Sequence, residues 1–302
     1  MINTACAVAL GFFDGVHIAH QKIIQTAVDY AKQNNLTPVA LTFDKSPIEI
    51  LRPDTARYLT ENDEKVRLIS ALGAETEFLK TDKSLLDMSA EDFILEILIK
   101  KYNVKYAVCG YNYRFGKGGT GDVELLKSYG EKYGFKTQSI PAIMSGGESV
   151  SSSRIRTLLK EGSIMQANHL LGRSFCIFGK VHHGKHLGRT LGFPTANVFP
   201  DNFCAQLKNG VYKTQVWVDN TIYKAITNAG INPTVGGENL RTETYIPQFE
   251  GNLYGKEIKI EFIDFLPKVG MNTYMIEFRL PRSYYSVYYM HLRNLKARPS
   301  VP

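Results

Sequence analysis

GFFDGVHIAH, at residues 11–20, is the stretch that decides the fold of the first half of this chain. An apolar run at residues 5–11 comes before it and is typical of a buried parallel strand. Residues 17–34 come after it, with apolar side chains near helical spacing. The stretch is therefore predicted to lie where the first strand ends and a helix begins.

The same alternation of strands and helices continues to residue 140. We expect further strands at residues 38–43, 106–110 and 136–140, and helices at residues 61–72, 89–102 and 123–133. Strands that alternate with helices predict an α/β fold with a doubly wound, Rossmann-like parallel sheet. Ligands of such sheets lie beyond the carboxyl ends of the strands, so the loops after these strands are where we expect the chemistry.

The second half has a different pattern. Apolar and polar residues alternate at residues 210–218, 221–227, 241–246 and 257–265, and turn signals separate these segments. Several short strands in succession predict an all-β domain, an antiparallel barrel or sandwich. The pattern changes after a helix-like stretch at residues 154–171, so we expect one domain at residues 1–171 and a second at 172–302.

Length and composition agree with this division. A chain of 302 residues favours two domains, and contents of 44% hydrophobic and 22% charged residues exclude wholesale disorder. No apolar run approaches the roughly 20 residues of a membrane helix, and residues 1–10 lack the basic flank of a signal peptide. The four cysteines form no C-x-x-C pair, which argues against a disulfide frame or a zinc site. We therefore expect a cytoplasmic protein without membrane contact.

The net charge of +7 invites a nucleic-acid interpretation, but its distribution weakens it. Residues 267–302 hold six Lys or Arg and one acid, so this tail alone carries +5 of the total. The rest of the chain is close to neutral, and nucleic-acid binding is disfavoured.

Residues 11–20 also carry candidate chemistry. His17 and His20 are three apart and share a face in a first helical turn. Free N–H groups at a helix start favour an anion, and Gly15 permits close backbone approach to it. Two imidazoles there can donate hydrogen bonds to phosphate oxygens. Two ordinary surface histidines are the alternative.

Two later segments strengthen the phosphate interpretation. GYNYRFG, at residues 110–116, follows a predicted strand, and VSSSRIR, at residues 150–156, opens a predicted helix with serines and arginines. With residues 11–20, these segments resemble the nucleotidyltransferase superfamily, and GYNYRFG is similar to a segment of bacterial FAD synthetases. Ala19 stands where that superfamily usually has glycine.

This resemblance implies specific roles for residues of the first half. His17 and His20 would be catalytic and would contact ATP phosphates. Asn112 and Phe115 would contact the flavin. The implied nucleotide-binding residues are Gly11, Phe13, Asp14, Gly15, Ser152 and Arg156.

A loop rich in glycine and basic residues, at residues 179–189, opens the chemistry of the second half. It leads into TLGFPTAN at residues 190–197, where Thr195 and Asn197 offer hard oxygens suited to Mg²⁺. These segments resemble riboflavin kinase, and Glu243 falls where that family carries its proposed general base. The implied nucleotide-binding residues here are Gly179, Gly184, Gly188 and Pro194.

Together the two halves resemble bacterial bifunctional riboflavin kinase/FAD synthetases. The resemblance implies phosphorylation of riboflavin by ATP to FMN and transfer of an adenylyl group from ATP to FMN, giving FAD, with Mg²⁺ in both halves. We expect a monomer or weak homo-oligomer. Three alternatives stay open: one activity only, a non-catalytic flavin-binding regulator, and a nucleic-acid binder acting through the basic tail.

The resemblance fails after Leu266. The family ends in an amphipathic helix, whereas Pro281 would interrupt a helix here and residues 284–289 have high strand propensity. Divergence and a shifted reading frame are both open explanations of residues 267–302. We expect this tail to weaken the riboflavin kinase activity.

Overall fold

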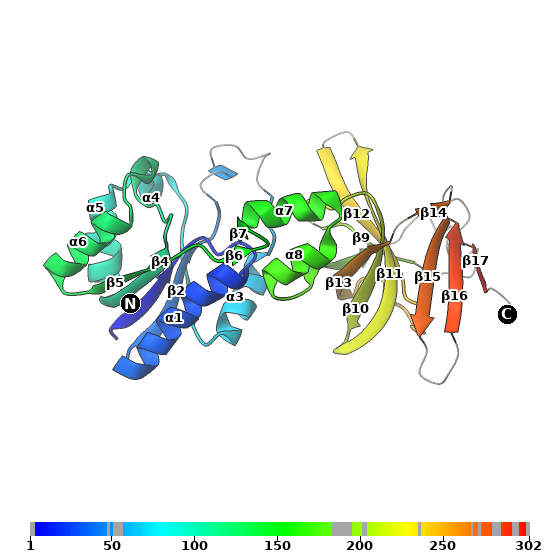
Figure 1. The fold of residues 1–302 in the computed structure, drawn as a ribbon, viewed down its shortest axis with the longest axis horizontal. Helices are drawn as coiled ribbons and strands as arrows, with labels where there is room; N and C mark the ends of the chain where they lie inside the picture. Colours follow the sequence, from blue (N-terminus) through cyan, green and yellow to red (C-terminus); the bar gives the residue numbers. More distant parts are fainter. Residues whose placement is uncertain are drawn as a thin grey trace. The chain divides into compact units, whose positions relative to one another are not determined.

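The computed structural model divides the chain into two compact units, Met1–Arg154 and Ile155–Pro302 (Figure 1). It describes residues 4–46, 49–50, 57–182, 195–200, 204–234, 237–266, 268–270, 273–279, 285–291 and 296–299. The domain boundary that we place at residue 172 lies at the end of a helix inside the second unit, and it stays a prediction.

The first unit contains the parallel sheet that the sequence predicts. Its five strands stand in the order β3-β2-β1-β4-β5, and their neighbours pair in parallel. The order reverses direction between β1 and β4, which is where open α/β sheets bind their ligands. The strands are β1 (Cys6–Leu10), β2 (Thr37–Phe43), β3 (Glu75–Leu79), β4 (Val104–Gly110) and β5 (Lys136–Ile140).

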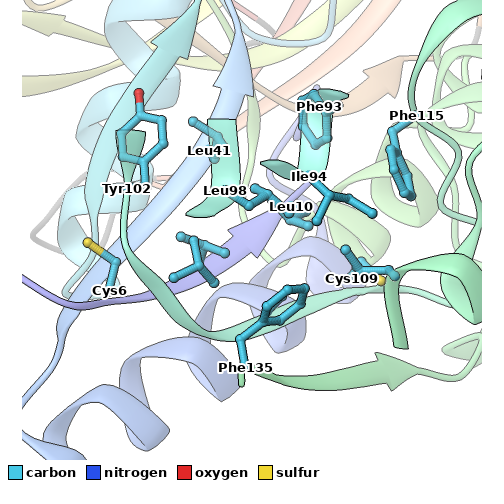
Figure 2. Close-up of a cluster of buried hydrophobic side chains, with 14 of the residues drawn as sticks. Cys6, Leu10, Leu41, Phe93, Ile94, Leu98, Tyr102, Cys109, Phe115 and Phe135 are labelled. Carbon is cyan, nitrogen blue, oxygen red and sulfur yellow. The ribbon is translucent and has the colours of Figure 1, made fainter. Parts of the chain in front are cut away.

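Strand β1 is buried on both faces of this sheet, which explains its uninterrupted apolar sequence. Cys6, Val8 and Leu10 belong to the hydrophobic cluster drawn in Figure 2, which also contains Phe93 and Leu98. Alternate residues of β1, Ala7 and Ala9, belong to a second cluster on the opposite face, together with apolar residues of α1. The helices are α1 (Ile18–Asn34), α3 (Asn62–Ala71), α4 (Lys83–Asp87), α5 (Ala90–Asp92), the π-helix η2 (Phe93–Lys101) and α6 (Val123–Tyr133).

Two predicted helices differ in detail from the structure. The segment expected at residues 89–102 begins with Ser89, whose side chain accepts from the N–H of Asp92, but it continues as the π-helix η2. The stretch expected at residues 154–171 is two helices, α7 (Ser152–Glu161) and α8 (Ile164–Leu171). Gly162 separates them with a φ of 82°, a left-handed conformation that ends a helix.

The second unit contains the predicted antiparallel barrel, closed in the order β10-β11-β12-β9-β8-β13. Asp219 and Asn220 join two of its strands with φ of 47° and 67°, the pair of left-handed residues typical of a type I′ hairpin. The strands are β8 (Phe175–His182), β9 (Thr195–Val198), β10 (Gly210–Val218), β11 (Thr221–Thr234), β12 (Gly237–Tyr245) and β13 (Glu257–Leu266).

The tail forms strands, as its sequence suggests. A four-stranded antiparallel sheet has the order β14-β15-β16-β17, with β16 covering most of the strand-prone segment. Pro281 and Tyr284 lie outside the described residues. The strands are β14 (Lys268–Gly270), β15 (Thr273–Arg279), β16 (Tyr285–His291) and β17 (Lys296–Pro299).

Candidate active sites

The loop between β1 and α1 has a tightly folded, strained backbone. Phe13, Gly15 and Val16 have φ of 53°, 84° and 39°, and a positive φ is unusual for a β-branched residue such as Val16. A Cβ on Gly11 would lie 2.7 Å from a ring carbon of Phe13, so only glycine fits there without a shift. Strained backbone of this kind gathers at functional sites, where the surrounding structure must hold it.

Three distant segments hold this loop. The hydroxyl of Thr42 donates to the carbonyl of Phe12 at 2.9 Å, and the N–H of Leu59 donates to the carboxylate of Asp14 at the same distance. The hydroxyl of Ser152 donates to the carbonyl of Asp14 at 2.8 Å. Asp14 and Ser152, both predicted to bind nucleotide, thus fix the loop, and Asp14 is only 1% exposed.

The two histidines stack at the start of α1. His17 is the N-cap residue, and its Nδ1 accepts from the N–H of His20 at 3.4 Å. The ring centroids of His17 and His20 are 3.5 Å apart, and Phe13 meets the His20 ring edge-on at 5.4 Å. Burial, followed by the charges of His17 and Lys65, lowers the pKa of His20 well below its ordinary value, so its imidazole is neutral at pH 7.

Nδ1 of His20 is buried and has no hydrogen-bond partner within the described part of the chain. A buried polar atom without a partner is costly, and a bound phosphate oxygen would supply one. The structure therefore brings together the two predicted catalytic histidines and leaves a hydrogen-bonding group ready for a ligand.

The two predicted flavin-binding residues in the loop after β4 lie in different environments, one exposed and one buried. Asn112 is exposed. Its Oδ1 lies next to Gly110, 3.4 Å from where a Cβ would stand if Gly110 were replaced by alanine. Phe115 is 5% exposed and packs against Phe93 and Tyr113, with ring centroids 5.4 Å and 5.6 Å away, as Figure 2 shows for Phe93. Asn112 is thus accessible to a ligand, whereas Phe115 serves the core; its flavin role stays a prediction.

The arginines of the VSSSRIR segment also differ from each other. Arg154 donates to the carbonyls of Ser145 and Glu148 at 2.9 Å and 3.1 Å, and its Nε lies 3.1 Å from the Glu148 carboxylate. It thereby holds the hairpin of β6 (Met144–Ser145) and β7 (Glu148–Ser149). Arg156, predicted to bind nucleotide, follows one turn after Ser152 on α7 and is partly buried.

In the barrel, the predicted base and a predicted metal ligand are opposite each other. Glu243 of β12 pairs in register with Asn197 of β9, and Thr195 pairs with Tyr245. Arg241 connects the first two: its Nη2 donates to Asn197 Oδ1 at 2.8 Å and lies 2.8 Å from Glu243 Oε1. The side chains of Arg241 and Glu243 are 21% and 34% exposed, so both are accessible to a ligand.

Buried threonines inside the barrel hold strand β12 in place. The hydroxyls of Thr214, Thr227 and Thr244 form a chain with spacings of 2.9 Å, and all three residues are buried. Thr242 is also buried and donates to the carbonyl of Val198. Because side chains alternate along a strand, Glu243 and Arg241 point away from these threonines, on one common face.

Comparisons with known proteins show which family the chain belongs to. Residues 1–154 match the family described as FAD synthetase, and residues 171–269 match the family described as riboflavin kinase. A bifunctional riboflavin kinase/FMN adenylyltransferase of Buchnera aphidicola is 37% identical over 86% of this chain and 84% of its own. The chain belongs to the bifunctional riboflavin kinase/FMN adenylyltransferase family.

Other members of this bifunctional family are similarly close. The enzymes of that name from Bacillus subtilis and Escherichia coli K12 are 35% and 34% identical, each over 84% of this chain and 82% of its own. A solved structure titled as a macrolide-efflux protein from Streptococcus pneumoniae has 30% identity and a TM-score of 0.80, covering 88% of each chain. In the part of this chain that the structure describes, no helix has both the length and the apolar character to cross a membrane.

Four residues of the second half are predicted from the family resemblance to bind nucleotide, and the structure supports this role for none of them. A Cβ on Gly179 would lie 2.5 Å from Val198, so this glycine lets β8 pack closely on β9, and its nucleotide role stays a prediction. Gly184, Gly188 and Pro194 lie outside the described residues. Sequence reasoning missed Arg241, although its place two residues before Glu243 on a strand puts it on the same face.

The donors near Glu243 suit magnesium in type. Thr195, Asn197 and Glu243 offer only oxygen, and Mg²⁺ in kinases takes few protein ligands because substrate phosphates and water complete its shell. Arg241 Nε is buried without a hydrogen-bond partner in the described residues, so this face also has a cationic donor left for a phosphate. No group of three or more His, Cys, Asp or Glu able to hold a metal occurs among those residues.

Proposed function

We propose that this chain makes FAD from riboflavin in two steps, each in its own unit. One observation carries the proposal: each half holds its reacting groups together, the stacked His17 and His20 in the first and the paired Glu243 and Asn197 in the second. Membership of the bifunctional family supports it over the alternatives of a single activity or a non-catalytic flavin binder.

In the barrel, the 5′-hydroxyl of riboflavin attacks the γ-phosphorus of ATP, and ADP leaves. Glu243 accepts the hydroxyl proton, and Arg241 holds its carboxylate in place at 2.8 Å. Thr195 and Asn197 would hold Mg²⁺, which when bound neutralises phosphate charge. The products are FMN, ADP and a proton.

In the first unit, a phosphate oxygen of FMN attacks the α-phosphorus of ATP. The bond to the α–β bridging oxygen breaks, and pyrophosphate leaves as FAD forms. His17 and His20 donate hydrogen bonds to the phosphate oxygens as charge builds on them, and the neutral imidazole of His20 suits this role because it keeps an N–H. Ser152 holds a phosphate from the start of α7, and Asn112 contacts the flavin; the nucleotide role of Arg156, which belongs to the second unit, stays an expectation.

Cellular location and assembly are part of the proposal. The four cysteines are free thiols, which supports a reducing compartment such as the cytoplasm. We propose a monomer or weak homo-oligomer whose partners are ATP, riboflavin and FMN, with no nucleic acid. The tail sheet stands where the family has a helix, and we expect it to weaken the riboflavin kinase activity.

Chromatography of flavins after incubation with riboflavin, ATP and Mg²⁺ tests both steps at once. His17→Ala should abolish FAD formation from FMN and leave FMN formation intact, because one lost donor to a developing charge costs about 2.7–4 kcal/mol. Glu243→Gln should do the reverse, with FMN formation lower by roughly 10²–10⁴-fold. If either variant lowers both activities equally, or neither, the assignment of one reaction to each unit is wrong.

A further inference from the structure

Lys65 occupies an unusual position on α3. It is 2% exposed, whereas its apolar neighbour Val66 is 36% exposed. Helix α3 therefore buries a lysine and presents a valine, the reverse of an ordinary amphipathic helix. Lysine is almost never fully buried unless it is paired, so its ammonium requires an explanation.

The surroundings of the ammonium come from the ends of three adjacent strands. Nζ lies 4.4 Å from the ring centroid of Phe12, which follows β1, and 5.7 Å from that of Phe78 in β3. The carboxylates of Asp14 and Asp44, after β1 and β2, act on it electrostatically. No hydrogen bond or ion pair to Nζ is found among the described residues, although an ammonium has three hydrogens to donate.

Both carboxylates are already engaged elsewhere. Asp14 accepts from the N–H of Leu59, and Asp44 accepts from the N–H of Thr81 at 2.7 Å. Burial lowers the pKa of Lys65 to about 8, against the opposing effect of Asp14 and Asp44. Its charge also acts on His20, whose Nδ1 lacks a partner as well. The partnerless Nδ1 of His20 and the ammonium of Lys65, which donates to no described residue, are therefore electrostatically coupled.

We propose that Lys65 binds a phosphate oxygen of the substrates during adenylyl transfer. The proposal rests on the function proposed above and adds a cationic residue that lies outside the three motifs of the first half. A phosphate oxygen would pair the buried ammonium, and the rings of Phe12 and Phe78 would keep water from competing with it. The phosphate is that of FMN or one of those of ATP.

The experiment uses the full chain with Lys65→Met, Lys65→Arg and a control, Lys100→Met, which removes an exposed lysine of the same unit. Lys65→Met should lower kcat/KM for FAD synthesis about 100-fold or more, while FMN formation and the control stay at the wild-type level. A higher KM for FMN alone identifies the FMN phosphate, a higher KM for ATP alone identifies ATP, and a lower kcat alone identifies charge formed in the transition state.

A pH profile separates phosphate binding from a purely structural charge. The ammonium must be protonated to bind, so wild-type kcat/KM should fall as the pH rises through about 8. The other ionisable groups that act on or respond to Lys65 are Asp14, Asp44 and His20; the lowered pKa of Asp44 keeps it ionised and the lowered pKa of His20 keeps it neutral throughout that range. In Lys65→Arg, which keeps its charge, the fall at about pH 8 should disappear.

Two results would overturn the proposal: a wild-type kcat/KM in Lys65→Met, or a fall near pH 8 that persists in Lys65→Arg. If the wild type makes no FAD from FMN, the proposed function fails, and calorimetric titration with ATP and FMN separately still decides the role of Lys65. Binding of ATP and FMN to the kinase unit contributes the same heat signal in all variants. A binding component lost only in Lys65→Met supports the role, and identical titrations refute it.

Discussion

Replacing Arg241 by methionine tests the link between Asn197 and Glu243. The change removes a charge-assisted hydrogen bond and an ion pair, both at 2.8 Å, and keeps much of the side-chain length. Such a hydrogen bond contributes about 1.5–3 kcal/mol when buried, and an exposed ion pair about 0–1 kcal/mol. Since the Arg241 and Glu243 side chains are 21% and 34% exposed, roughly 1–2 kcal/mol of positioning should be lost.

A loss of about 1.4 kcal/mol in the transition state corresponds to a tenfold lower rate. We expect kcat for FMN formation to fall about tenfold and FAD formation from supplied FMN to stay unchanged. Lys259→Met is the matched control, because Lys259 and Glu261 form a similar pair on β13, with 2.7 Å between charged atoms and side chains 19% and 16% exposed.

Flavin chromatography gives both rates, and thermal unfolding reports stability. If Arg241→Met and Lys259→Met lower FMN formation to the same extent, Arg241 contributes only to barrel stability. If FMN formation in Arg241→Met rises above wild type, the guanidinium restrains Glu243 as a base instead of positioning it. Either result refutes the positioning argument.

Three further predictions concern the first unit. Gly11→Ala should reduce FAD formation strongly and spare FMN formation, because its Cβ would meet the buried Phe13 ring at 2.7 Å; normal FAD formation would show that the loop can relax. The rate of FAD formation should stay constant as the pH falls through 6.5, because the lowered pKa of His20 keeps that imidazole neutral to a more acidic pH. A decrease in the rate centred at pH 6.5 would contradict this. Asn112→Ala should raise KM for FMN without changing the unfolding temperature, since the side chain is exposed, whereas Phe115→Ala should cost about 3–5 kcal/mol of unfolding free energy measured by denaturant titration. Equal stabilities of those two variants would contradict the packing role of Phe115.

The parts of the molecule that could be predicted are those encoded by contiguous residues. The turn into α1 and the stacked pair of His17 and His20 follow from local spacing, as does the Asp219–Asn220 hairpin. Strand β3 was missed because it lies at the edge of the sheet and two glutamates in its five residues, ETEFL, hide the apolar pattern of a strand.

The unpredicted site residues depend on tertiary structure. Lys65 follows Glu64 and precedes Val66, a sequence typical of an exposed helix turn, and its burial arises only when β1, β2 and β3 end beside it. Phe115 and Gly179 show a different limit of sequence-based prediction. A motif places them correctly in sequence, but sequence cannot separate a residue that packs the core from one that touches a ligand.

The hydrogen bond from Ser152 to Asp14 spans 138 residues of the chain. The ribosome makes the loop between β1 and α1 well before the Ser152 hydroxyl that holds its Asp14 carbonyl, which emerges only after all five strands of the sheet. A nascent chain that stops before residue 152 contains β1 to β5 yet lacks one of the three supports of its strained loop. The loop that carries the two stacked histidines therefore reaches its final shape only after Ser152 has been made, long after the histidines themselves.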